Sequence, residues 1–458
     1  MMKKLSVLFL LVVLPIIKAY CQNAPEFDYY VTTPDRKSLL THNPEIEHDF
    51  DEQKAFTINV DEKIKYQTVE GFGYTLTGGS AYLIRQKLTE SQRKSLLKEL
   101  FSEKEGIGLQ WLRISVGASD LNAFPFTYQE KQKDIFNLNH DKTDLIPLLQ
   151  EIVKINPKIK LLATPWSPPV WMKDNGSYIG GSLLKSHHGT YAAYLVKYVR
   201  AMKTLGLTIH ALTPQNEPEN PHNNPSLLMT AAEQSDFIAN YLGPAFRKAG
   251  IKTKIILFDH NCDHPEYPIE ILKNKKANPY IEGSAFHLYA GEISALSKVH
   301  NAFPDKNIYF TEQWTSSEGQ FGGDLQWHIR NVIIGSLRNW SKVAMEWNLA
   351  NDKEMRPHTE GGCDKCLGAI TIDENGHNPN VAYFVIAHAS QWIPPGSVRI
   401  KSNVTADFPN VVVLRPDGRK AMILMNSKNE TQDFIISDKN RSNKLSLEAG
   451  AVATVVWK

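Results

Sequence analysis

The sequence predicts an α/β protein: a (β/α)8 TIM barrel with a side antiparallel β-sandwich domain built from both chain ends. Between Gly71 and about residue 394, short apolar runs alternate eight times with longer amphipathic stretches. Strand-like segments lie both before and after this region. Repeated strand–helix alternation favours parallel strands covered by helices. A doubly wound open sheet is the alternative architecture.

Residues 1–21 have the pattern of a secretory signal peptide. Two lysines precede an apolar run over residues 5–17, and small residues follow near Ala19. This run is too short to cross a bilayer as a helix. We therefore expect an exported protein, periplasmic or extracellular, without stable membrane insertion. A transmembrane anchor and a lipid anchor on Cys21 are the alternatives.

The charge balance argues against a nucleic-acid partner. The chain has 51 Lys and Arg and 49 Asp and Glu, a formal net charge of +2. Residues 1–21 hold three lysines and no acid, so their removal leaves a charge of about −1. Nucleic-acid binding depends on clustered positive charge, and the chain has no long basic run.

Three cysteines follow the expected signal peptide. Cys363 and Cys366 lie in the Gly-rich stretch GGCDKCLG, and Cys262 lies apart from them. One local disulfide between the pair is one interpretation. A zinc site is the other, but it needs two more ligands and only His358 is near in sequence, so we expect no metal.

The elements follow in order along the chain. Residues 27–66 are predicted to form N-terminal strands of the β-sandwich, as in FDYYVTT and KAFTINVD. Residues 67–394 are predicted to form the barrel. Its eight strands are expected at the runs GFGYTLTGGSA, LQWLRISVG, IKLLATPWS, IHALTPQNE, TKIILFDHN, GSAFHLYA, KNIYFTEQW and SKVAMEWNLA.

Helices are predicted between these runs, where apolar residues recur at spacings of three and four. Clear examples are TDLIPLLQEIVKIN, TYAAYLVKYVRAMKTLG and SDFIANYLGPAFRKAG. The helical period stops near Pro395. Residues 395–458 alternate apolar and polar positions around turns such as Asp417-Gly418, and we expect them to complete the sandwich.

Polar and aromatic residues gather at the predicted carboxyl ends of the barrel strands, where active sites of this fold lie. Aromatic rings stack on the apolar faces of sugars, while carboxylates, amides and imidazoles bind hydroxyls, so this rim favours a carbohydrate partner. No Gly-rich phosphate loop, serine elbow or HExxH helix competes with it. The strand ends carry Arg113, Trp166, Asn216, Glu217, Asp259, His260, His287, Tyr289, Glu312, Gln313, Trp314, Glu346, Trp347 and Asn348.

Glu217 and Glu312 are the candidate catalytic pair, because glycoside hydrolysis needs two carboxyl groups on either side of the anomeric carbon. We expect a separation of about 5–5.5 Å, as in retaining enzymes. Asn216 is expected to face the sugar's 2-hydroxyl. The charge of Glu312 is expected to raise the pKa of Glu217. Ordinary rim salt bridges are the alternative for either glutamate.

Other residues of the rim have supporting interpretations. Arg113 is predicted to pair with Glu312 and hold it ionised, with a structural salt bridge as the alternative. His287 is predicted to orient other groups by hydrogen bonding, and Trp314 to be either a sugar platform or barrel packing. The stretch FDHNCDH lacks regular ligand spacing, so we expect rim hydrogen bonds there, and no metal or cofactor.

The motifs GFGYTLTGGSA, WLRISVGASD, TPWSPPVWMKDNG, PQNEPEN, SAFHLY, YFTEQW and EWNLAND occur together in this order. The set resembles glycoside hydrolase family 30, which includes glucosylceramidase, from about Gly71 to Leu349 and in the terminal β-domain. The resemblance implies that Glu217 is the acid/base and Glu312 the nucleophile. It also implies that the attacked sugar is held by Arg113, Trp166, Asn216, Tyr289 and Trp347.

One position departs from the glucosylceramidase pattern. In that pattern, the threonine of the first motif is followed by an aspartate, which is expected to bind the outer hydroxyls of the sugar. Here Thr77 is followed by Gly78. We expect the missing carboxylate to open the site, as in the bacterial β-1,6-glucanase subgroup that the chain resembles. An endo-β-1,6-glucanase is therefore expected. Glucosylceramidase, exo-β-glucosidase and a non-catalytic carbohydrate-binding protein are the alternatives.

Overall fold

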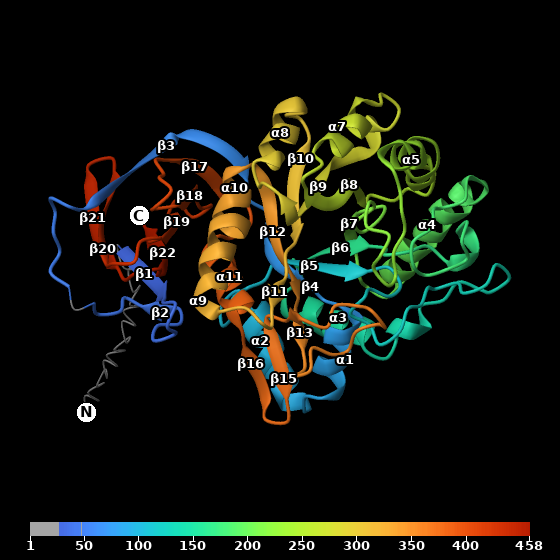
Figure 1. Ribbon diagram of the computed structural model, residues 1–458, viewed down its shortest axis with the longest axis horizontal. Helices are drawn as coiled ribbons and strands as arrows, with labels where there is room; N and C mark the ends of the chain where they lie inside the picture. Colours follow the sequence, from blue (N-terminus) through green and yellow to red (C-terminus); the bar gives the residue numbers. More distant parts are fainter. Residues whose placement is uncertain (1–26, 47) are drawn as a thin grey trace, which may run out of the picture.

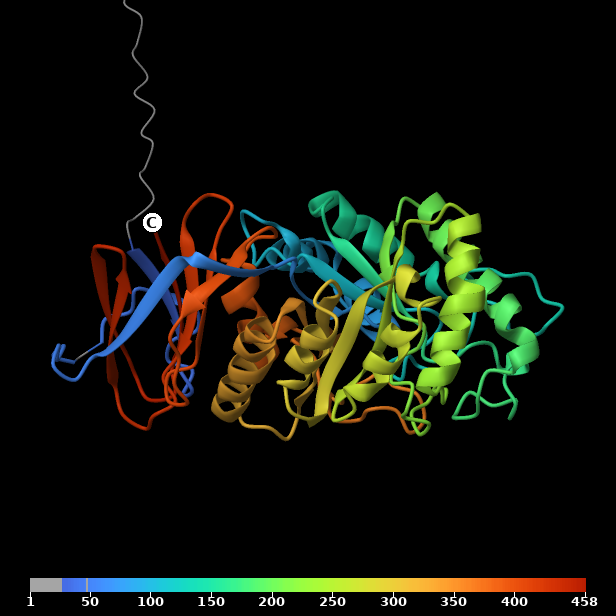
Figure 2. The same cartoon turned by 90° about the horizontal axis from the view of Figure 1, so that it is seen from above.

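A computed structural model describes residues 27–46 and 48–458, so the expected signal peptide lies outside the described residues. The described chain forms two lobes side by side, a barrel and a β-sheet domain (Figures 1 and 2). The carboxyl terminus lies in the sheet domain, next to the first described strand. Within the described part of the chain, no helix combines the length and apolarity needed to cross a membrane.

The predicted eight-stranded barrel is confirmed. Its parallel strands close in the order β10-β12-β4-β5-β6-β7-β8-β9, which excludes the open-sheet alternative. All eight expected runs supply one strand each. The strands are β4 (Gly71–Thr75), β5 (Trp111–Ser115), β6 (Lys160–Thr164), β7 (Ile209–Leu212), β8 (Lys254–Cys262), β9 (Ile281–Gly291), β10 (Asn307–Glu312) and β12 (Ser341–Asn348).

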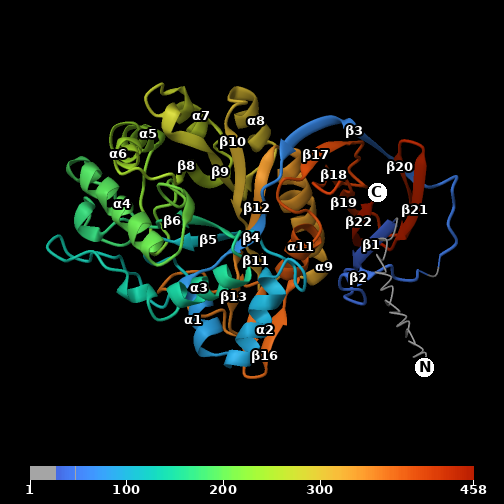
Figure 3. The same ribbon diagram turned by 180° about the vertical axis from the view of Figure 1, so that it is seen from behind.

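Helices cover the outside of the barrel (Figure 3). Thr89 and Thr230 are the N-caps of α2 and α5. Each forms a capping box, in which side chains accept hydrogen bonds from backbone N–H groups that have no partner within the helix. Two π-helical stretches, Ile238–Leu242 and Ile329–Gly335, join α5 to α6 and α9 to α10. The helices are α1 (Gly78–Gln86), α2 (Glu90–Phe101), α3 (Leu145–Ile155), α4 (His188–Thr204), α5 (Ala231–Phe237), α6 (Gly243–Lys248), α7 (Glu266–Lys273), α8 (Ala295–Ala302), α9 (Phe321–His328), α10 (Ser336–Arg338) and α11 (Val381–Ser390).

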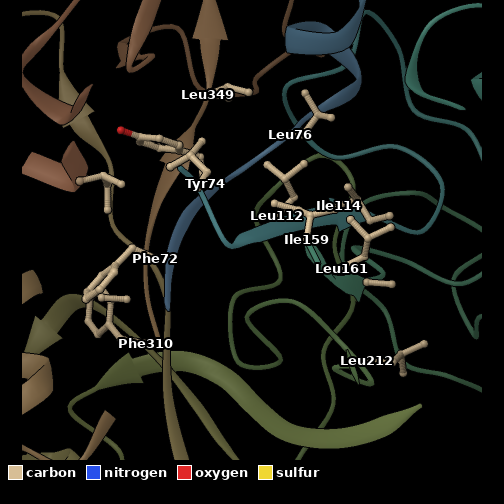
Figure 4. Packing of buried hydrophobic residues seen from close by; sticks show 14 of the residues in the cluster. Phe72, Tyr74, Leu76, Leu112, Ile114, Ile159, Leu161, Leu212, Phe310 and Leu349 are labelled. Atoms are coloured by element: carbon tan, nitrogen blue, oxygen red, sulfur yellow. The ribbon is translucent and has the colours of Figure 1, made fainter. Parts of the chain in front are cut away.

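Alternate residues of the barrel strands face two different cores. Phe72 and Tyr74 on β4 and Leu112 on β5 belong to the large cluster between strands and helices (Figure 4). Residues of opposite parity form a separate cluster inside the barrel, which includes Trp111 and Tyr309. Because alternate residues face inward, the residue two positions after an inward one also points into the barrel, nearer its carboxyl end. Arg113 follows Trp111 in this way, and Thr311 follows Tyr309.

The sheet domain draws strands from both chain ends, as predicted. Its nine strands hydrogen-bond in the order β2-β1-β22-β19-β18-β17-β3-β20-β21. The strands are β1 (Phe27–Thr32), β2 (Thr41–His42), β3 (Phe56–Thr68), β17 (Val398–Ser402), β18 (Asn410–Leu414), β19 (Lys420–Met425), β20 (Gln432–Asp438), β21 (Arg441–Leu447) and β22 (Val452–Trp457).

One pairing differs from the antiparallel arrangement that we expected, because β3 and β20 run parallel. The long strand β3 extends from the sheet domain to the barrel, and it lies between β17 and β20 (Figure 2). Because β3 leads directly into the barrel strand β4, the barrel sets the direction of β3. The strand β20 pairs with it in the parallel orientation.

The sheet has one face towards its own core and one towards the barrel. Val412 and Met422 belong to the sandwich core, whereas Val411 and Ile423 belong to the large barrel cluster. The helix α11 packs between the two lobes, and all ten of its residues are buried, eight of them in that cluster. The two lobes therefore share one continuous apolar contact.

Candidate active site

Glu217 and Glu312 meet at the carboxyl-terminal mouth of the barrel. Glu312 is the last residue of β10, and Glu217 lies in the loop that follows β7. Glu217 has a positive φ of 43°, a backbone conformation that is unusual for glutamate and often occurs at functional sites. Both side chains line a hollow of about 310 Å³, formed by Asp120, Trp166, Asn216, Glu217, Asn220, Asn223, Asn261, Tyr289, Glu312, Trp314, Trp347, Cys363 and Cys366.

The spacing of the two carboxylates matches the retaining geometry. One oxygen of Glu217, one oxygen of Glu312 and a ring nitrogen of His287 all lie within 4.8 Å of one another. Retaining enzymes keep their carboxyl groups about 5–5.5 Å apart, whereas inverting enzymes leave about 6.5–9.5 Å for a water molecule. The pair therefore fits the retaining spacing and not the wider inverting one.

Arg113 connects the residues around Glu312. Its Nη1 donates to Glu312 Oε2 at 2.5 Å, and its Nη2 donates to Asn216 Oδ1 at 2.5 Å and to Asp259 Oδ2 at 2.8 Å. The guanidinium also lies 4.8 Å from the centroid of the Trp166 ring. The predicted pairing of Arg113 with Glu312 is confirmed.

Asp259 is a residue of the network that the sequence analysis left among rim hydrogen bonds. Its buried carboxylate accepts hydrogen bonds from Arg113, Thr213 (2.8 Å), Thr311 (2.6 Å) and His287 Nε2 (3.1 Å). These donors hold its pKa well below the ordinary value, against the effect of burial. Asp259 is thus a fixed negative charge under the catalytic pair.

A β-bulge in β8 explains why Asp259 points inward. Ile256 faces the barrel interior, so strict alternation would also turn Phe258 inward. Phe258 and Asp259 instead have φ values of 74° and 67°, and the register against β9 shifts there. Phe258 consequently packs outside the barrel, and Asp259 takes the inward position.

His287 lies between the two glutamates. Its Nδ1 is 3.3 Å from Glu217 Oε1 and 3.6 Å from Glu312 Oε1. Burial lowers its pKa, but the charge of Glu312 and the hydrogen bonds to Asp259 and Glu217 outweigh burial and raise the pKa to about 9. His287 is therefore an imidazolium at neutral pH, and its predicted hydrogen-bonding position is present.

The pKa order of the two glutamates differs from our expectation. Burial would raise the pKa of Glu217, but the hydrogen bond and charge of His287 outweigh it and lower the pKa to about 2. For Glu312, burial and the charges of Glu217 and Asp259 raise the pKa, although His287 and Arg113 oppose them. The expectation of a raised pKa for Glu217 is wrong here, because it ignored the cation between the carboxylates.

Aromatic side chains form one wall of the hollow. Trp166 and Trp347 lie with ring centroids 5.5 Å apart, and Trp314 packs against the same cluster. The buried Nε1 of Trp166 has no hydrogen-bond partner, so it is available to a ligand. Tyr289 donates from its hydroxyl to Glu312 Oε1 at 2.8 Å. Trp314 packs against this cluster, as in the packing interpretation, and it also lines the hollow.

Asp120 is a second residue that the sequence analysis missed. Its carboxyl is buried at the hollow, and its Oδ1 has no hydrogen-bond partner. Burial and the negative charges of Glu312 and Glu217 raise its pKa to about 7. Asp120 lies in the long loop between β5 and α3, five residues beyond the end of β5. It is the last residue of the motif WLRISVGASD, but no role was predicted for it.

The expectation that Gly78 opens the active site is wrong. Gly78 lines a different hollow, and a Cβ at this position would lie 1.9 Å from Asn122 Nδ2. The side chain of Asn122 therefore fills the space directly beside the Cα atom of Gly78. Asp120 supplies a carboxylate at the catalytic hollow, so the site does not lack one.

Cys363 and Cys366 form a disulfide at the edge of the hollow. Their sulfur atoms are bonded to each other, which rules out the zinc interpretation. Cys366 belongs to β14 (Cys366–Leu367), which pairs with β11 (Thr315–Ser316) just after Glu312. The backbone oxygen of Asp120 accepts a hydrogen bond from Thr359 N at 2.8 Å, so this loop also holds Asp120.

Glu217, His287 and Glu312 lie close enough together to ligate a cation. Both ring nitrogens of His287 already have carboxylate partners, Nδ1 with Glu217 at 3.3 Å and Nε2 with Asp259 at 3.1 Å. The FDHNCDH stretch is divided: Asp259 points into the barrel, while His264 pairs with Glu219 at the surface. We therefore assign no metal to either group.

Two other hollows, of about 380 and 600 Å³, share Glu70 and Lys160 near the amino ends of the strands. Neither is lined by Glu217 or Glu312.

Comparison with known proteins agrees with this geometry. The chain matches the glycosyl hydrolase family 30 TIM-barrel domain over residues 69–393 and the family 30 beta sandwich domain over residues 396–455. It is 35% identical to an endo-1,6-beta-D-glucanase of Neurospora crassa, over 85% of this chain and 82% of that protein. It is 28% identical to lysosomal acid glucosylceramidase of Mus musculus, over 86% and 82%.

A solved endo-β-1,6-glucanase superposes with a TM-score of 0.88 at 33% identity, covering 94% of this chain and 99% of that one. Both lobes are thus covered by family matches, and their order along the chain agrees with the family's. The chain belongs to glycoside hydrolase family 30 and is a retaining glycoside hydrolase that acts on carbohydrate.

Proposed function

We propose that this hydrolase is an endo-β-1,6-glucanase, with Glu217 as acid/base and Glu312 as nucleophile. The closely spaced carboxylate pair carries the proposal of mechanism. The proposal of substrate is supported by the endo-β-1,6-glucanases, which are 30–35% identical to this chain, against 27–28% for the glucosylceramidases. Gly78 does not support this choice of substrate, because it does not line the catalytic hollow.

In the first step, a Glu312 oxygen attacks the anomeric carbon and the glycosidic C–O bond breaks. The leaving oxygen takes the proton of Glu217, so a covalent glycosyl-enzyme and a free hydroxyl result. In the second step, Glu217 removes a proton from water while the water oxygen attacks the same carbon. The ester bond to Glu312 breaks, and the original anomeric configuration returns.

His287 supplies the proton that Glu217 needs. Its Nδ1 donates to Glu217 Oε1 at 3.3 Å, and its Nε2 donates to Asp259 Oδ1 at 3.1 Å. Transfer of the Nδ1 proton to Glu217 leaves a neutral imidazole that still donates to Asp259. The total charge of the site does not change, so this transfer reconciles the low pKa of Glu217 with its role as acid.

Arg113 orients the groups that hold the sugar. Because Asn216 Oδ1 accepts from Arg113, the Nδ2 amino group of Asn216 is turned away and can donate to the 2-hydroxyl of the attacked sugar. Tyr289 and Arg113 both donate to Glu312, which fixes the nucleophile. Trp166 and Trp347 provide rings for the apolar face of the sugar.

A product profile tests the substrate. Linear β-1,6-glucan, glucosylceramide and an aryl β-glucoside are digested side by side, and the products are separated by size. We expect a ladder of oligosaccharides from the glucan. Release of glucose or ceramide only from the short substrates would replace this proposal with the exo-glucosidase or glucosylceramidase alternative.

Azide rescue tests the two roles. We expect Glu217→Ala and Glu312→Ala each to lower kcat by roughly 10³-fold or more. Without Glu312, azide attacks from the vacated face and gives the α-glucosyl azide. Without Glu217, an activated aryl glucoside still forms the glycosyl-enzyme, and azide then gives the β-glucosyl azide. The reverse stereochemistry would exchange the roles, and Glu219→Gln on the same loop is the matched control.

We also propose that the protein is exported. The disulfide between Cys363 and Cys366 supports this proposal, since such bonds persist in oxidising compartments. Cell fractionation of the full-length protein, and of a chain lacking residues 1–21, tests it. Retention of the full-length protein in the cytoplasm would contradict it.

A further inference from the structure

A second hollow lies on the same rim of the barrel, and we refer to it as the rim hollow. It has a volume of about 450 Å³ and lies among α1, the long loop between β5 and α3, and the start of α3. Neither catalytic glutamate contributes to it. Its lining residues are Gly78, Gly79, Tyr82, Asn122, Ala123, Phe124, Phe126, His140, Asp141, Asp144, Leu145 and Pro357.

Two exposed aromatic side chains give this hollow its character. Tyr82 is 40% exposed and Phe124 is 55% exposed, although most large apolar side chains of the described chain are buried. Neighbouring rings hold Phe124 in place: His140 and Phe126 lie with ring centroids 5.9 and 6.1 Å away. A rigid ring that remains open to solvent costs little entropy when it binds a flat apolar surface.

Polar side chains lie beside these rings. Asp144 lines the hollow at the start of α3 and accepts a hydrogen bond from Gln86 Nε2 at 2.6 Å, and Asn122 lines it from the preceding loop. Aromatic rings with carboxylate and amide groups beside them fit the two surfaces of a sugar, its apolar face and its hydroxyls. The same composition does not fit an anion, since no Lys or Arg lines the hollow.

The rim hollow and the catalytic hollow share one wall. Asp120 lines the catalytic hollow and Asn122 lines the rim hollow, and Cα atoms two residues apart are at most about 7 Å apart. Hydrogen bonds fix this wall: Leu121 O accepts from Gly79 N at 2.9 Å, and Asp120 O accepts from Thr359 N at 2.8 Å. The two hollows therefore lie next to each other on the rim, within the length of a chain of a few sugars.

We propose that the rim hollow is an outlying subsite that binds further glucose units of the glucan chain being cleaved at Glu217 and Glu312. This inference rests on the proposed endo action on a glucan. Tyr82 and Phe124 are the sugar platforms of the subsite. They act on the affinity for long substrates and leave the chemical step untouched.

The test compares the double variant Tyr82→Ala/Phe124→Ala with the wild type on long linear β-1,6-glucan and on an aryl β-glucoside. We expect kcat/KM on the long glucan to fall roughly tenfold, mainly through KM, because each of the two stacked rings contributes about threefold. Activity on the aryl glucoside stays within about twofold. The ring-preserving variant Tyr82→Phe/Phe124→Tyr retains most of the wild-type activity on both.

Trp327→Ala is the matched control, since Trp327 is 40% exposed and lines neither hollow. An unchanged KM of the double alanine variant on the glucan overturns the inference, and so does an equal loss on both substrates. Failure of the wild type itself to cleave β-1,6-glucan refutes the proposed function instead. The two failures are thereby distinguished.

Discussion

At the scale of single residues, the site is a compact set of charges buried under the sugar position. Arg113 and the imidazolium of His287 are positive, and Asp259, Glu217 and Glu312 are negative. Removing one member of such a buried set lowers the stability of the protein, because its partner is left as an unpaired buried charge. The set explains why the protonation of Glu217 cannot be deduced from Glu312 alone.

The pH profile of kcat/KM should show the proton held by His287. Because the pKa of His287 is raised to about 9, activity should fall as the pH rises through about 9. On the acid side, activity should fall as Glu312 takes up a proton, at a pH above its ordinary 4.5. His287→Asn should lower kcat roughly 10²-fold and move the basic limb to lower pH, since the limb then reports Glu217 alone.

His264→Gln is the control for this experiment, because His264 pairs with Glu219 at the surface. A basic limb at the same pH in the His287→Asn variant would show that another group holds the proton. Rates measured on an aryl glucoside with a good leaving group should depend less on His287, since such a group needs less protonation.

At the scale of single elements, the sequence predicts most of the strands and few of the exceptions. The apolar runs locate every barrel strand because inward and outward residues both pack in cores. The bulge at Phe258 and Asp259 was not predicted, since neither residue is a glycine or asparagine that would signal a positive φ. The inward role of Asp259 was missed for that reason.

Loops were predicted less well than strands. Glu217 and Glu312 could be found because each closely follows an apolar run. Asp120 could not, since it lies in a long loop whose course is fixed by contacts with Thr359, far away in sequence. Gly78 was misinterpreted because its meaning depends on Asn122, which only the folded chain brings to it.

The disulfide loop gives a prediction at this scale. Reduction of Cys363–Cys366, or the variant Cys363→Ser/Cys366→Ser, should raise KM several-fold with a smaller effect on kcat. Cys366 packs with Trp166 and Trp347, so the wall of the sugar site loosens while the glutamates stay on their strands. The loop is short, so the chain-entropy loss is only about 2 kcal/mol. Steady-state kinetics with and without a reductant measure the effect.

The serine variant also provides the control, because a reductant should not alter it further. Equal KM values for the oxidised and reduced wild type would mean that the loop is held by its other contacts. The pairing of β14 with β11 and the hydrogen bonds of Thr359 are the contacts that would then carry the wall.

At the scale of the whole molecule, the two lobes are joined by packing as well as by the chain. The fold class was predicted correctly because the helical pattern stops near Pro395 and period-two alternation follows it. The parallel pairing of β3 with β20 was not predictable from those patterns, since alternation does not encode strand direction. It follows from the need for β3 to enter the barrel.

Glu70 ties together the amino end of the barrel, where β3 leads into β4, and it yields a stability prediction. Its carboxylate lies 2.7 Å from Lys160 Nζ and 2.7 Å from Lys342 Nζ. Burial opposes ionisation, but hydrogen bonds from the two lysines lower the pKa to about 2. The resulting stability is present above pH 4.5 and is lost as the pH falls through about 2.

Glu70→Gln should therefore lower the unfolding free energy by roughly 2 kcal/mol at pH 7, after allowance for partial exposure, and by less near pH 3. Calorimetric melting at both pH values measures the difference. Glu266→Gln removes an exposed pair with Lys298 and should not shift the midpoint. A deficit for Glu70→Gln that is equal at both pH values would show that the carboxylate acts through packing and not through its charge.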